Sequence, residues 1–173
     1  MKNITCRACT AADAATLAAL GAQTFCETFE HCNTSEDMRQ YISENFTPAA
    51  LARELAIPQS EFYLAESAGR PAAYMKINFG AAQTEPHFPG CAEVQRLYVL
   101  AEYKRTGIGK ALMETALRRA REEDSAGIWL GVWEHNYPAQ AFYKTFGFSQ
   151  VGAHTFVLGQ DVQTDLIFYK KLP

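Results

Sequence analysis

The sequence lacks an apolar segment long enough to cross a membrane. No apolar run in its 173 residues approaches the roughly 18 residues that a membrane-spanning helix needs. Residues 1–5 carry no apolar stretch of the kind found in a secretory signal peptide. We therefore expect a soluble, cytoplasmic protein.

An excess of basic residues is also missing. The chain has 16 Lys and Arg against 19 Asp and Glu, which gives a net charge of −3 and an isoelectric point near 5.8. A nucleic-acid-binding surface needs a basic stripe, so this class of function is not expected. An acidic balance is compatible with a cationic substrate.

The five cysteines lack the spacing of a metal site. They are an odd number and lie at positions 6, 9, 26, 32 and 91. The pair Cys6-x-x-Cys9 falls on a short strand pattern and not at the start of a helix, where a thiolate would be stabilised. We expect small reduced side chains, with no disulfide and no bound metal.

No repeat, linker or low-complexity stretch interrupts the chain, so we expect one domain over residues 1–173. A strand at 92–100 precedes a helix with an apolar stripe, and the apolar run 127–133 is typical of a buried parallel strand. This unit predicts a right-handed crossover in an α/β protein with a mixed sheet. Further strands are expected at 2–9, 61–67, 73–79, 149–157 and 166–170, with helices beginning near Thr10, Thr34, Thr47 and Asn136.

A glycine-rich turn joins the strand at 92–100 to its helix. Its residues are Lys104, Arg105, Thr106, Gly107, Ile108, Gly109 and Lys110. Two glycines one residue apart allow a sharp turn, and the clustered N–H groups with the positive end of a helix make an anion site. A pyrophosphate is the natural occupant. A dinucleotide-binding turn would have a third glycine where this chain has Leu112, and the spacing of a Walker loop is absent.

Two motifs resemble signatures of the GCN5-related N-acetyltransferases, the GNAT family. Residues 105–112 resemble the Arg/Gln-x-x-Gly-x-Gly/Ala loop, which holds the pyrophosphate of acetyl-coenzyme A in that family. Residues 136–148 resemble the second signature, Asn-x-x-Ala-x-x-Phe/Leu-Tyr-x-x-x-Gly-Phe. The resemblance covers nearly the whole chain. It implies a GNAT fold, with a central, mixed, twisted sheet of about seven strands flanked by helices.

The resemblance also implies acetyl-coenzyme A as the co-substrate. The turn 104–110 would hold its pyrophosphate. The pantetheine arm would bind like an added strand to the backbone of Leu97, Tyr98 and Val99, and Asn136 would contact the arm from the other side. Because this binding uses the main chain, side-chain identity matters little at these strand positions.

Acetyl transfer to an amine poses two proton problems. An alkyl amine with a pKa near 10.4 is mostly protonated at pH 7.4, and neutralising it costs about 4 kcal/mol. The leaving thiolate must also be protonated. The resemblance implies that Tyr143 protonates the leaving thiolate, because a phenol stays a proton donor at neutral pH. Packing against the sheet is the alternative role of this side chain.

The proton acceptor is predicted by spacing. Relatives that acetylate protein N-termini carry Glu where this chain has Gly131, so that assignment fails here. Glu93 lies 13 residues before Thr106, the separation of the general-base glutamate in histone-acetylating relatives. It is therefore the predicted base, acting directly or through a water, with a solvated strand carboxylate as the alternative. Glu134 is the second candidate.

The later part of the chain resembles the PaiA branch of the family, whose members acetylate spermidine and spermine. The similar segments are 129–136, 154–159 and 163–165. The predicted acceptor is therefore a small polyamine, and neither nucleic acid nor a membrane is an expected partner. The protein is expected to be a monomer or a homodimer. Acceptor contacts are predicted for Phe29, Tyr74, Trp133 and Glu134.

The predicted acceptor groove consists of residues 25–46, 74–90 and 154–165, and 80–90 is a candidate mobile loop. Its basic residues are only Arg39 and Lys76. The acidic and aromatic candidates are Glu27, Glu30, Glu36, Asp37, Glu85, Asp161, Asp165, Phe29, Tyr41 and Tyr74. A solvated acidic face is the alternative interpretation. A protein lysine or N-terminal acetyltransferase and a non-catalytic acyl-coenzyme A-binding module remain alternative functions.

Overall fold

The computed structural model describes residues 3–31 and 33–173, which form a seven-stranded sheet. Its strands lie in the order β1-β2-β3-β4-β5-β7-β6. β4 and β5 run parallel, and the other neighbouring pairs are antiparallel, so the predicted mixed sheet is confirmed. The strands are β1 (Ile4–Ala8), β2 (Ser60–Ser67), β3 (Arg70–Asn78), β4 (Ala92–Val99), β5 (Gly127–Trp133), β6 (Ser149–Leu158) and β7 (Asp161–Lys171).

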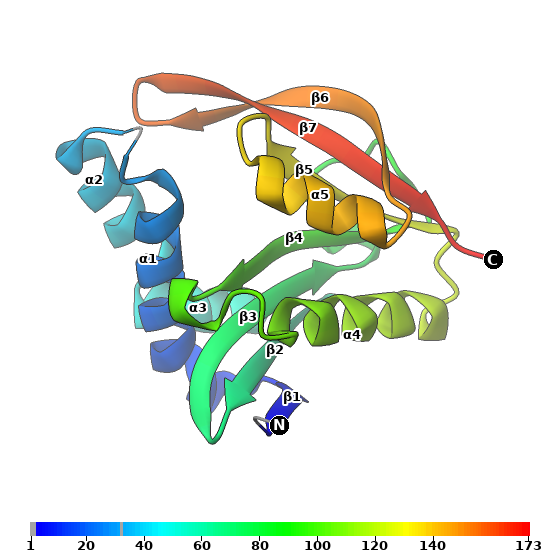
Figure 1. Ribbon diagram of the computed structural model, residues 1–173, viewed down its shortest axis with the longest axis horizontal. Helices are drawn as coiled ribbons and strands as arrows, with labels where there is room; N and C mark the ends of the chain where they lie inside the picture. Colours follow the sequence, from blue (N-terminus) through cyan, green and yellow to red (C-terminus); the bar gives the residue numbers. More distant parts are fainter. Residues whose placement is uncertain (1–2, 32) are drawn as a thin grey trace.

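Helices flank this sheet. In Figure 1, α4 and α5 cross the front of the sheet, whereas α1 and α2 gather at its left end. The hydroxyl oxygens of Thr34 and Thr47 accept hydrogen bonds from backbone N–H groups in the first turns of α2 and α3, as the sequence predicts. The helices are α1 (Ala14–Phe29), α2 (Ser35–Asn45), α3 (Pro48–Leu55), α4 (Ile108–Glu122) and α5 (Tyr137–Thr145).

The sheet separates two apolar layers. Alternate residues of β2 point to opposite faces, so Tyr63 and Ala65 pack with α4, while Phe62 and Leu64 pack with α1 and α3. The apolar stripe predicted for α4 is buried throughout, which confirms that interpretation. Its members are Leu112, Met113, Ala116, Leu117 and Ala120.

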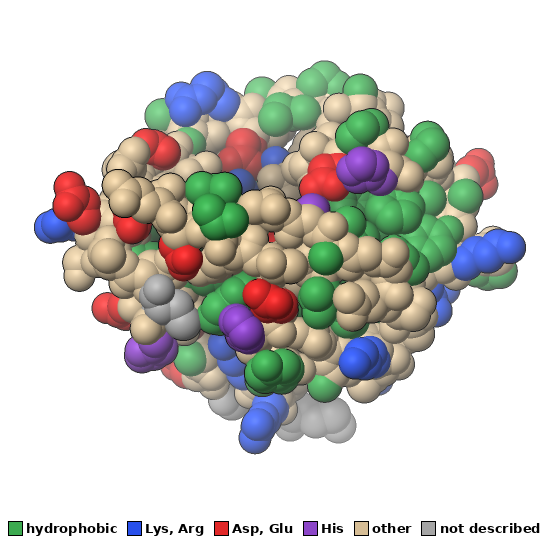
Figure 2. All heavy atoms as spheres, turned by 90° about the horizontal axis from the view of Figure 1, so that it is seen from above, with side chains coloured by type: hydrophobic (Ala, Val, Ile, Leu, Met, Phe, Trp, Pro, Cys, Tyr) green, Lys and Arg blue, Asp and Glu red, His purple; other side chains and the backbone are tan. Residues whose placement is uncertain are grey.

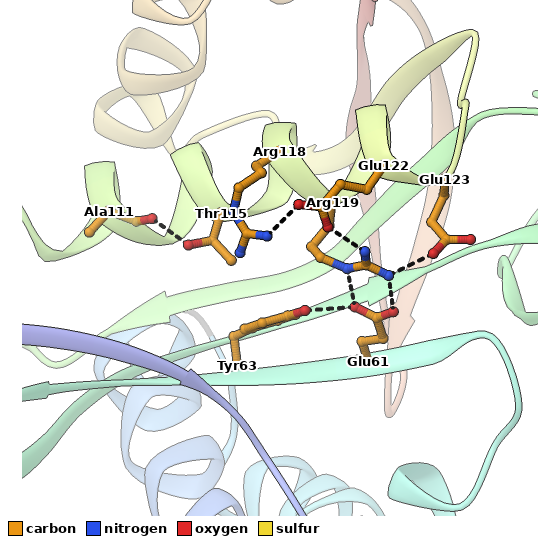
Figure 3. A network of polar contacts seen from close by, with 8 residues as sticks. All are labelled: Glu61, Tyr63, Ala111, Thr115, Arg118, Arg119, Glu122 and Glu123. Carbon is orange, nitrogen blue, oxygen red and sulfur yellow. Dashed lines mark hydrogen bonds and ion pairs between the residues drawn. The ribbon is translucent and has the colours of Figure 1, made fainter.

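An ion-pair network fixes α4 to β2 (Figure 3). Arg119 donates two hydrogen bonds to the carboxylate of Glu61, at 2.9 and 2.6 Å, and pairs with Glu122 and Glu123 on its own helix. The Tyr63 hydroxyl also donates to Glu61, at 2.8 Å. The Arg119 guanidinium holds the pKa of Glu61 below its usual value. Since α4 begins at the glycine-rich turn, this network positions that turn relative to the sheet.

The last hairpin is longer than the sequence indicates. β6 continues to Leu158, and β7 begins at Asp161, five residues before the predicted start of the last strand. Gly159 makes the turn with a φ of 60°, a conformation that glycine adopts without a steric penalty. The extension places His154 opposite Asp165 in the β6–β7 register. These two residues therefore belong to the sheet and not to a loop.

Candidate active site

The parallel strands β4 and β5 separate after two pairs of residues. Ala92 lies opposite Ile128 and Glu93 opposite Trp129, and no further pair joins the two strands in the described chain. Residues 97–99 have strand partners only in β3, so their other edge faces the separation. An extended group such as a pantetheine arm can bind to an edge of this kind through backbone hydrogen bonds.

The turn 104–110 carries a run of unbonded backbone N–H groups. Arg105 and Gly107 adopt left-handed conformations, with φ values of 63° and 93°. Within residues 3–31 and 33–173, no acceptor bonds the N–H groups of residues 105–110. Helix α4 begins at Ile108, so its positive end lies in the same place.

This turn fits a pyrophosphate. Six successive N–H donors, a helix N-terminus and nearby cationic side chains form an anion site at the end of β4. The hydroxyl of Thr106 donates to Tyr103 O at 2.6 Å, which fastens the turn to its own base. A Cβ at Gly107 would make an ordinary contact with Ile4 Cδ1 at 3.9 Å, so the positive φ, and not crowding, accounts for glycine at this position.

Tyr143 lies on α5, beside the separation of the strands. Its ring is edge-on to Phe142, Phe148 and Phe168, with centroid distances of 5.3, 6.0 and 6.5 Å, and the residue is 8% exposed. Burial raises the pKa of Tyr143, and the nearby Tyr98 adds to the shift. The hydroxyl therefore stays protonated at neutral pH. No hydrogen bond to another residue of the described chain holds this hydroxyl, which leaves its proton for a ligand.

The side chain of Asn136 caps the helix that carries Tyr143. Its Oδ1 accepts a hydrogen bond from Ala139 N at 3.3 Å, and Pro138 occupies the first turn. Gln140, on the same helix, donates to the carbonyl oxygens of Trp133 and Glu134. These contacts tie the start of α5 to the end of β5. The Glu134 side chain is 41% exposed and lies 3.7 Å from His135.

Glu93 lies at the closed end of the separation and is 3% exposed. Its carboxylate accepts hydrogen bonds from Asn78 Nδ2 at 3.1 Å and from Thr84 N at 2.7 Å. The Thr84 hydroxyl also bonds to it. Both carboxylate oxygens are thus engaged, and Glu93 connects β4 to the segment 80–90.

The segment 80–90, a candidate mobile loop from its sequence, packs against the sheet. Gln83 accepts a hydrogen bond from Trp129 Nε1 at 2.7 Å. Phe88 lies against Trp129 and Tyr169, with centroid distances of 5.3 and 5.5 Å. With the Thr84 contacts, these interactions give the segment a defined position beside the site.

A group of charged residues lies between α3 and the strands β3 and β4. Glu54, on α3, accepts hydrogen bonds from Lys76 at 2.6 Å and from Arg96 at 2.9 and 3.1 Å. Burial alone would raise the pKa of Glu54, but Arg96 and Lys76 together hold it below its usual value. Sequence analysis missed Glu54 and Arg96 and treated Lys76 as a free groove cation. The signal for Arg96 was a second charged residue, besides Glu93, in the strand Ala92–Val99.

We expect Glu54→Gln to lower the free energy of unfolding by about 2–3 kcal/mol, because it leaves two buried cations without their carboxylate. Lys76 and Arg96 are only 6% and 11% exposed, whereas Glu54 is 19% exposed. The lowered pKa of Glu54 means that its stabilisation is present above the unfolded-state pKa and is lost as the pH falls through the folded-state value. Urea unfolding of both proteins at pH 7 and pH 4 measures this effect, with exposed Glu44→Gln as the control. An equal loss in both variants would contradict it.

Aromatic side chains form a wall on the acceptor side. Phe29 packs against Trp133 and Phe156, with centroid distances of 5.7 and 6.2 Å, and Tyr41 lies 6.2 Å from Phe156. These contacts join α1 and α2 to β5 and β6. The hydroxyl of fully buried Tyr74 has no hydrogen-bond partner in the described residues, and burial raises its pKa.

The predicted acidic groove residues divide into separate groups. Glu27 accepts a hydrogen bond from Ala101 N at 2.9 Å, so it faces the start of the pyrophosphate turn and not the acceptor side. Glu36 and Asp37 lie in the first turn of α2. Glu85 and Asp165 approach each other, since both contact His154.

Gly131 leaves space for that histidine. A Cβ at this position would lie 3.3 Å from His154 Nε2 and 3.4 Å from Asp165 Oδ2. Burial raises the pKa of Asp165, His154 opposes the shift, and Glu85 adds to it. Figure 2 shows, on the upper face of the molecule, a hollow with acidic, basic and histidine side chains around it.

The strand separation, the donor turn and the buried tyrosine together define an acyl-coenzyme A-dependent acyltransferase. The chain matches the acetyltransferase (GNAT) family model over residues 23–148. It is 38% identical, over 154 residues and 89% of each chain, to an uncharacterized N-acetyltransferase of the pepI 3′ region of Lactobacillus delbrueckii subsp. lactis. The chain belongs to the GNAT family, and it is an N-acetyltransferase that uses acetyl-coenzyme A as co-substrate.

Two further proteins that resemble this chain are one sequence and one solved structure. Over 105 residues, covering 61% of this chain and 62% of the relative, the sequence is 34% identical to the N-alpha-acetyltransferase RimI of Mycobacterium tuberculosis. The structure resembles a PaiA N-acetyltransferase from Thermoplasma acidophilum solved in complex with coenzyme A, with a TM-score of 0.81 and 22% identity over 98% of this chain and 99% of the other. The latter likeness shows the fold. None of the helices in the described ranges is long and apolar enough to span a membrane.

Proposed function

We propose that this N-acetyltransferase acetylates a small polyamine such as spermidine or spermine. The observation that carries the proposal is that carboxylates outnumber cationic side chains on the acceptor side of the sheet. Glu54, Glu85, Glu93 and Asp165 stand against two cations, Lys76 and Arg96. The hydroxyls of Tyr41 and Tyr98 lie near both Arg96 and Asp165, so these charged groups surround one region.

The aromatic wall supports the same acceptor. Phe29, Trp133, Tyr41 and Phe156 offer ring faces to the methylene segments and ammonium groups of a flexible cation. The predicted contact Tyr74 lies beneath this wall, and its ring centroid is 5.9 Å from that of Tyr98. The predicted contact Glu134 lies at the exposed end of β5 and would interact with a more distant ammonium group.

A second candidate function is N-terminal acetylation of a protein. The likeness to an N-alpha-acetyltransferase over 61% of the chain favours it. Gly131 speaks against it, because many relatives that acetylate protein N-termini have a glutamate here. The two functions share the cofactor site and differ only in the acceptor that binds in the predicted acceptor groove.

The residues of this chain divide the reaction between them. Acetyl-coenzyme A supplies an acetyl group activated as a thioester. The N–H groups of residues 105–110 hold its pyrophosphate, and the free edge of residues 97–99 orients the pantetheine arm, with Asn136 on the other side. Tyr143 gives its hydroxyl proton to the sulfur as the C–S bond breaks, and its raised pKa keeps that proton available.

Glu93 stays a prediction as the group that takes the proton from the acceptor ammonium. Its contacts with Asn78 and Thr84 also fit a second role, in which it anchors the segment 80–90. As a base it would act through a water, because its oxygens are engaged and it is 3% exposed. The two roles differ in their pH dependence, since alkaline solvent supplies neutral amine but does not replace an anchor.

We expect salt to weaken polyamine binding more than monoamine binding. Raising the salt from about 50 to about 300 mM should raise KM for spermine about fivefold and KM for a monoamine less than twofold, because more charges are screened. Steady-state kinetics with both acceptors measures the difference. Equal salt sensitivity, or faster turnover of N-terminal or lysine peptides than of every polyamine, would contradict the polyamine proposal and favour the second candidate.

A further inference from the structure

His154 lies between two carboxylates on the acceptor side of the sheet. Its Nδ1 contacts Oε1 of Glu85, from the segment 80–90, and its Nε2 lies 3.6 Å from Oδ2 of Asp165, its register partner on β7. The three side chains are 20–25% exposed, so they are shielded but within reach of a ligand. No other role described above uses this histidine.

The two ring nitrogens have different surroundings. The carboxylate beside Nδ1 favours the tautomer that carries the proton on Nδ1, although this close contact does not have the geometry of a hydrogen bond. The lone pair is then on Nε2, which faces the bare backbone of Gly131 at 3.3 Å from the position of a Cβ. Nε2 lies 3.6 Å from Asp165 Oδ2, which is longer than a normal hydrogen bond, so its lone pair can still accept a proton from a ligand.

Tyr98, on β4, lies near both the proposed proton donor and the carboxylate beside His154. Burial is the main cause of the raised pKa of Tyr98, and Asp165 adds to it. Burial likewise raises the pKa of Tyr143, and Tyr98 adds to that shift. An amine above Gly131 could contact Asp165 and Nε2 together.

We propose that His154 is the catalytic base that takes the proton from the acceptor ammonium. This inference rests on the proposed N-acetyl transfer. Glu85 orients the imidazole, and Asp165 attracts the ammonium. One N–H bond of the ammonium breaks, its proton moves to Nε2, and the nitrogen lone pair forms the bond to the acetyl carbon.

The remaining bond changes release the thiol and return Tyr143 and His154 to their starting states. The C–S bond breaks with its electron pair on sulfur, and Tyr143 protonates the sulfur. The second N–H proton, which the nitrogen loses after the C–N bond forms, replaces the proton on Tyr143. His154 releases its proton to solvent, so each turnover yields one amide, one thiol and one proton. Imidazole suits this role because histidine is the side chain that enzymes most often use as a general base.

The groups that face His154 come from several elements. Glu85 and His87 belong to the segment 80–90 and lie 3.2 Å apart, and Asp165 comes from β7. Tyr98 and Arg96, from β4, and Tyr41, from α2, lie near Asp165 or one another. Any change in the pH profile must therefore be compared with a variant of a neighbouring titratable group.

The test measures kcat/KM for a monoamine from pH 6.5 to 9.5 in His154→Gln, Glu93→Gln and His87→Gln. His87 is a matched control, because it also contacts Glu85 but is 64% exposed. We expect His154→Gln to lower kcat/KM about 30-fold at pH 7, and the defect to shrink toward pH 9.5 as solvent supplies neutral amine. Glu93→Gln should show the same factor at every pH, and His87→Gln no defect.

A second variant and two further measurements guard against a folding defect. Gly131→Ala puts a methyl group against Nε2 and should reproduce part of the loss, while melting temperature and coenzyme A affinity stay those of the wild type. A pH-independent defect in His154→Gln, or a defect that shrinks with pH only in Glu93→Gln, would overturn the assignment of His154 and favour Glu93. If the wild type acetylates no amine, the proposed function itself fails.

Discussion

Tyr143→Phe is expected to lower kcat by about 10²–10³ while coenzyme A affinity stays within about twofold of the wild type. The substitution removes only the hydroxyl, and the ring contacts with Phe142, Phe148 and Phe168 remain. Because the hydroxyl donates no hydrogen bond in the described chain, its loss leaves no protein acceptor unsatisfied. The loss should therefore appear in turnover and not in stability.

The pH dependence gives this prediction a second readout. Since the pKa of Tyr143 is raised, the wild-type hydroxyl stays protonated across the neutral range, and the defect of Tyr143→Phe should be constant from pH 6.5 to 9. Tyr137→Phe, on the same helix but 66% exposed, is the control and should have normal kcat. Unchanged turnover in Tyr143→Phe would assign the residue to packing alone.

The features predicted from sequence are local ones. The turn 104–110 was recognisable because its glycines, the preceding apolar strand and the following amphipathic helix are contiguous. Left-handed Arg105 and Gly107 and the unbonded N–H groups follow directly from that short segment. The parallel placement of β4 and β5 follows from the length of the connection and the apolar character of 127–133.

The features that sequence analysis missed are pairings between distant residues. Glu54 precedes Arg96 by 42 positions, and no local pattern marks them as partners. The contact of His154 with Glu85 depends on the packing of the segment 80–90 against β5 and β7. Glu27 shows the converse error, since an acidic residue in a predicted groove faces a different part of the site.

Glu93 shows that motif spacing can predict the position of a carboxylate without predicting its role. Its separation from the glycine turn identified a carboxylate on the acceptor face of β4, next to the strand separation. Its two neighbours, Asn78 and Thr84, come from β3 and from the segment before β4. Whether such a carboxylate removes a proton or holds a segment depends on these neighbours, which spacing does not reveal.

Gly107→Asp should weaken coenzyme A binding by about 10²–10³, because it places a carboxylate among the N–H donors that would otherwise hold the pyrophosphate. The wild type should gain about 2.7 kcal/mol of stability when coenzyme A is present at a hundredfold excess over its dissociation constant. At the same ligand concentration the variant should show almost no thermal shift. A Cβ at position 107 makes only an ordinary contact with Ile4, at 3.9 Å, so the substitution introduces no clash there.

Two controls separate charge from backbone strain in this experiment. Gly107→Asn has nearly the same shape and the same strained φ of 93° but no charge, so it should retain more affinity than Gly107→Asp. Gly69→Asp introduces the same residue at a φ of 75°, in open space, in the β2–β3 turn. It should lose a similar amount of intrinsic stability and keep the full coenzyme A shift. A wild-type shift in Gly107→Asp, or an equal loss of the shift in Gly69→Asp, would show that the turn 104–110 does not hold the pyrophosphate.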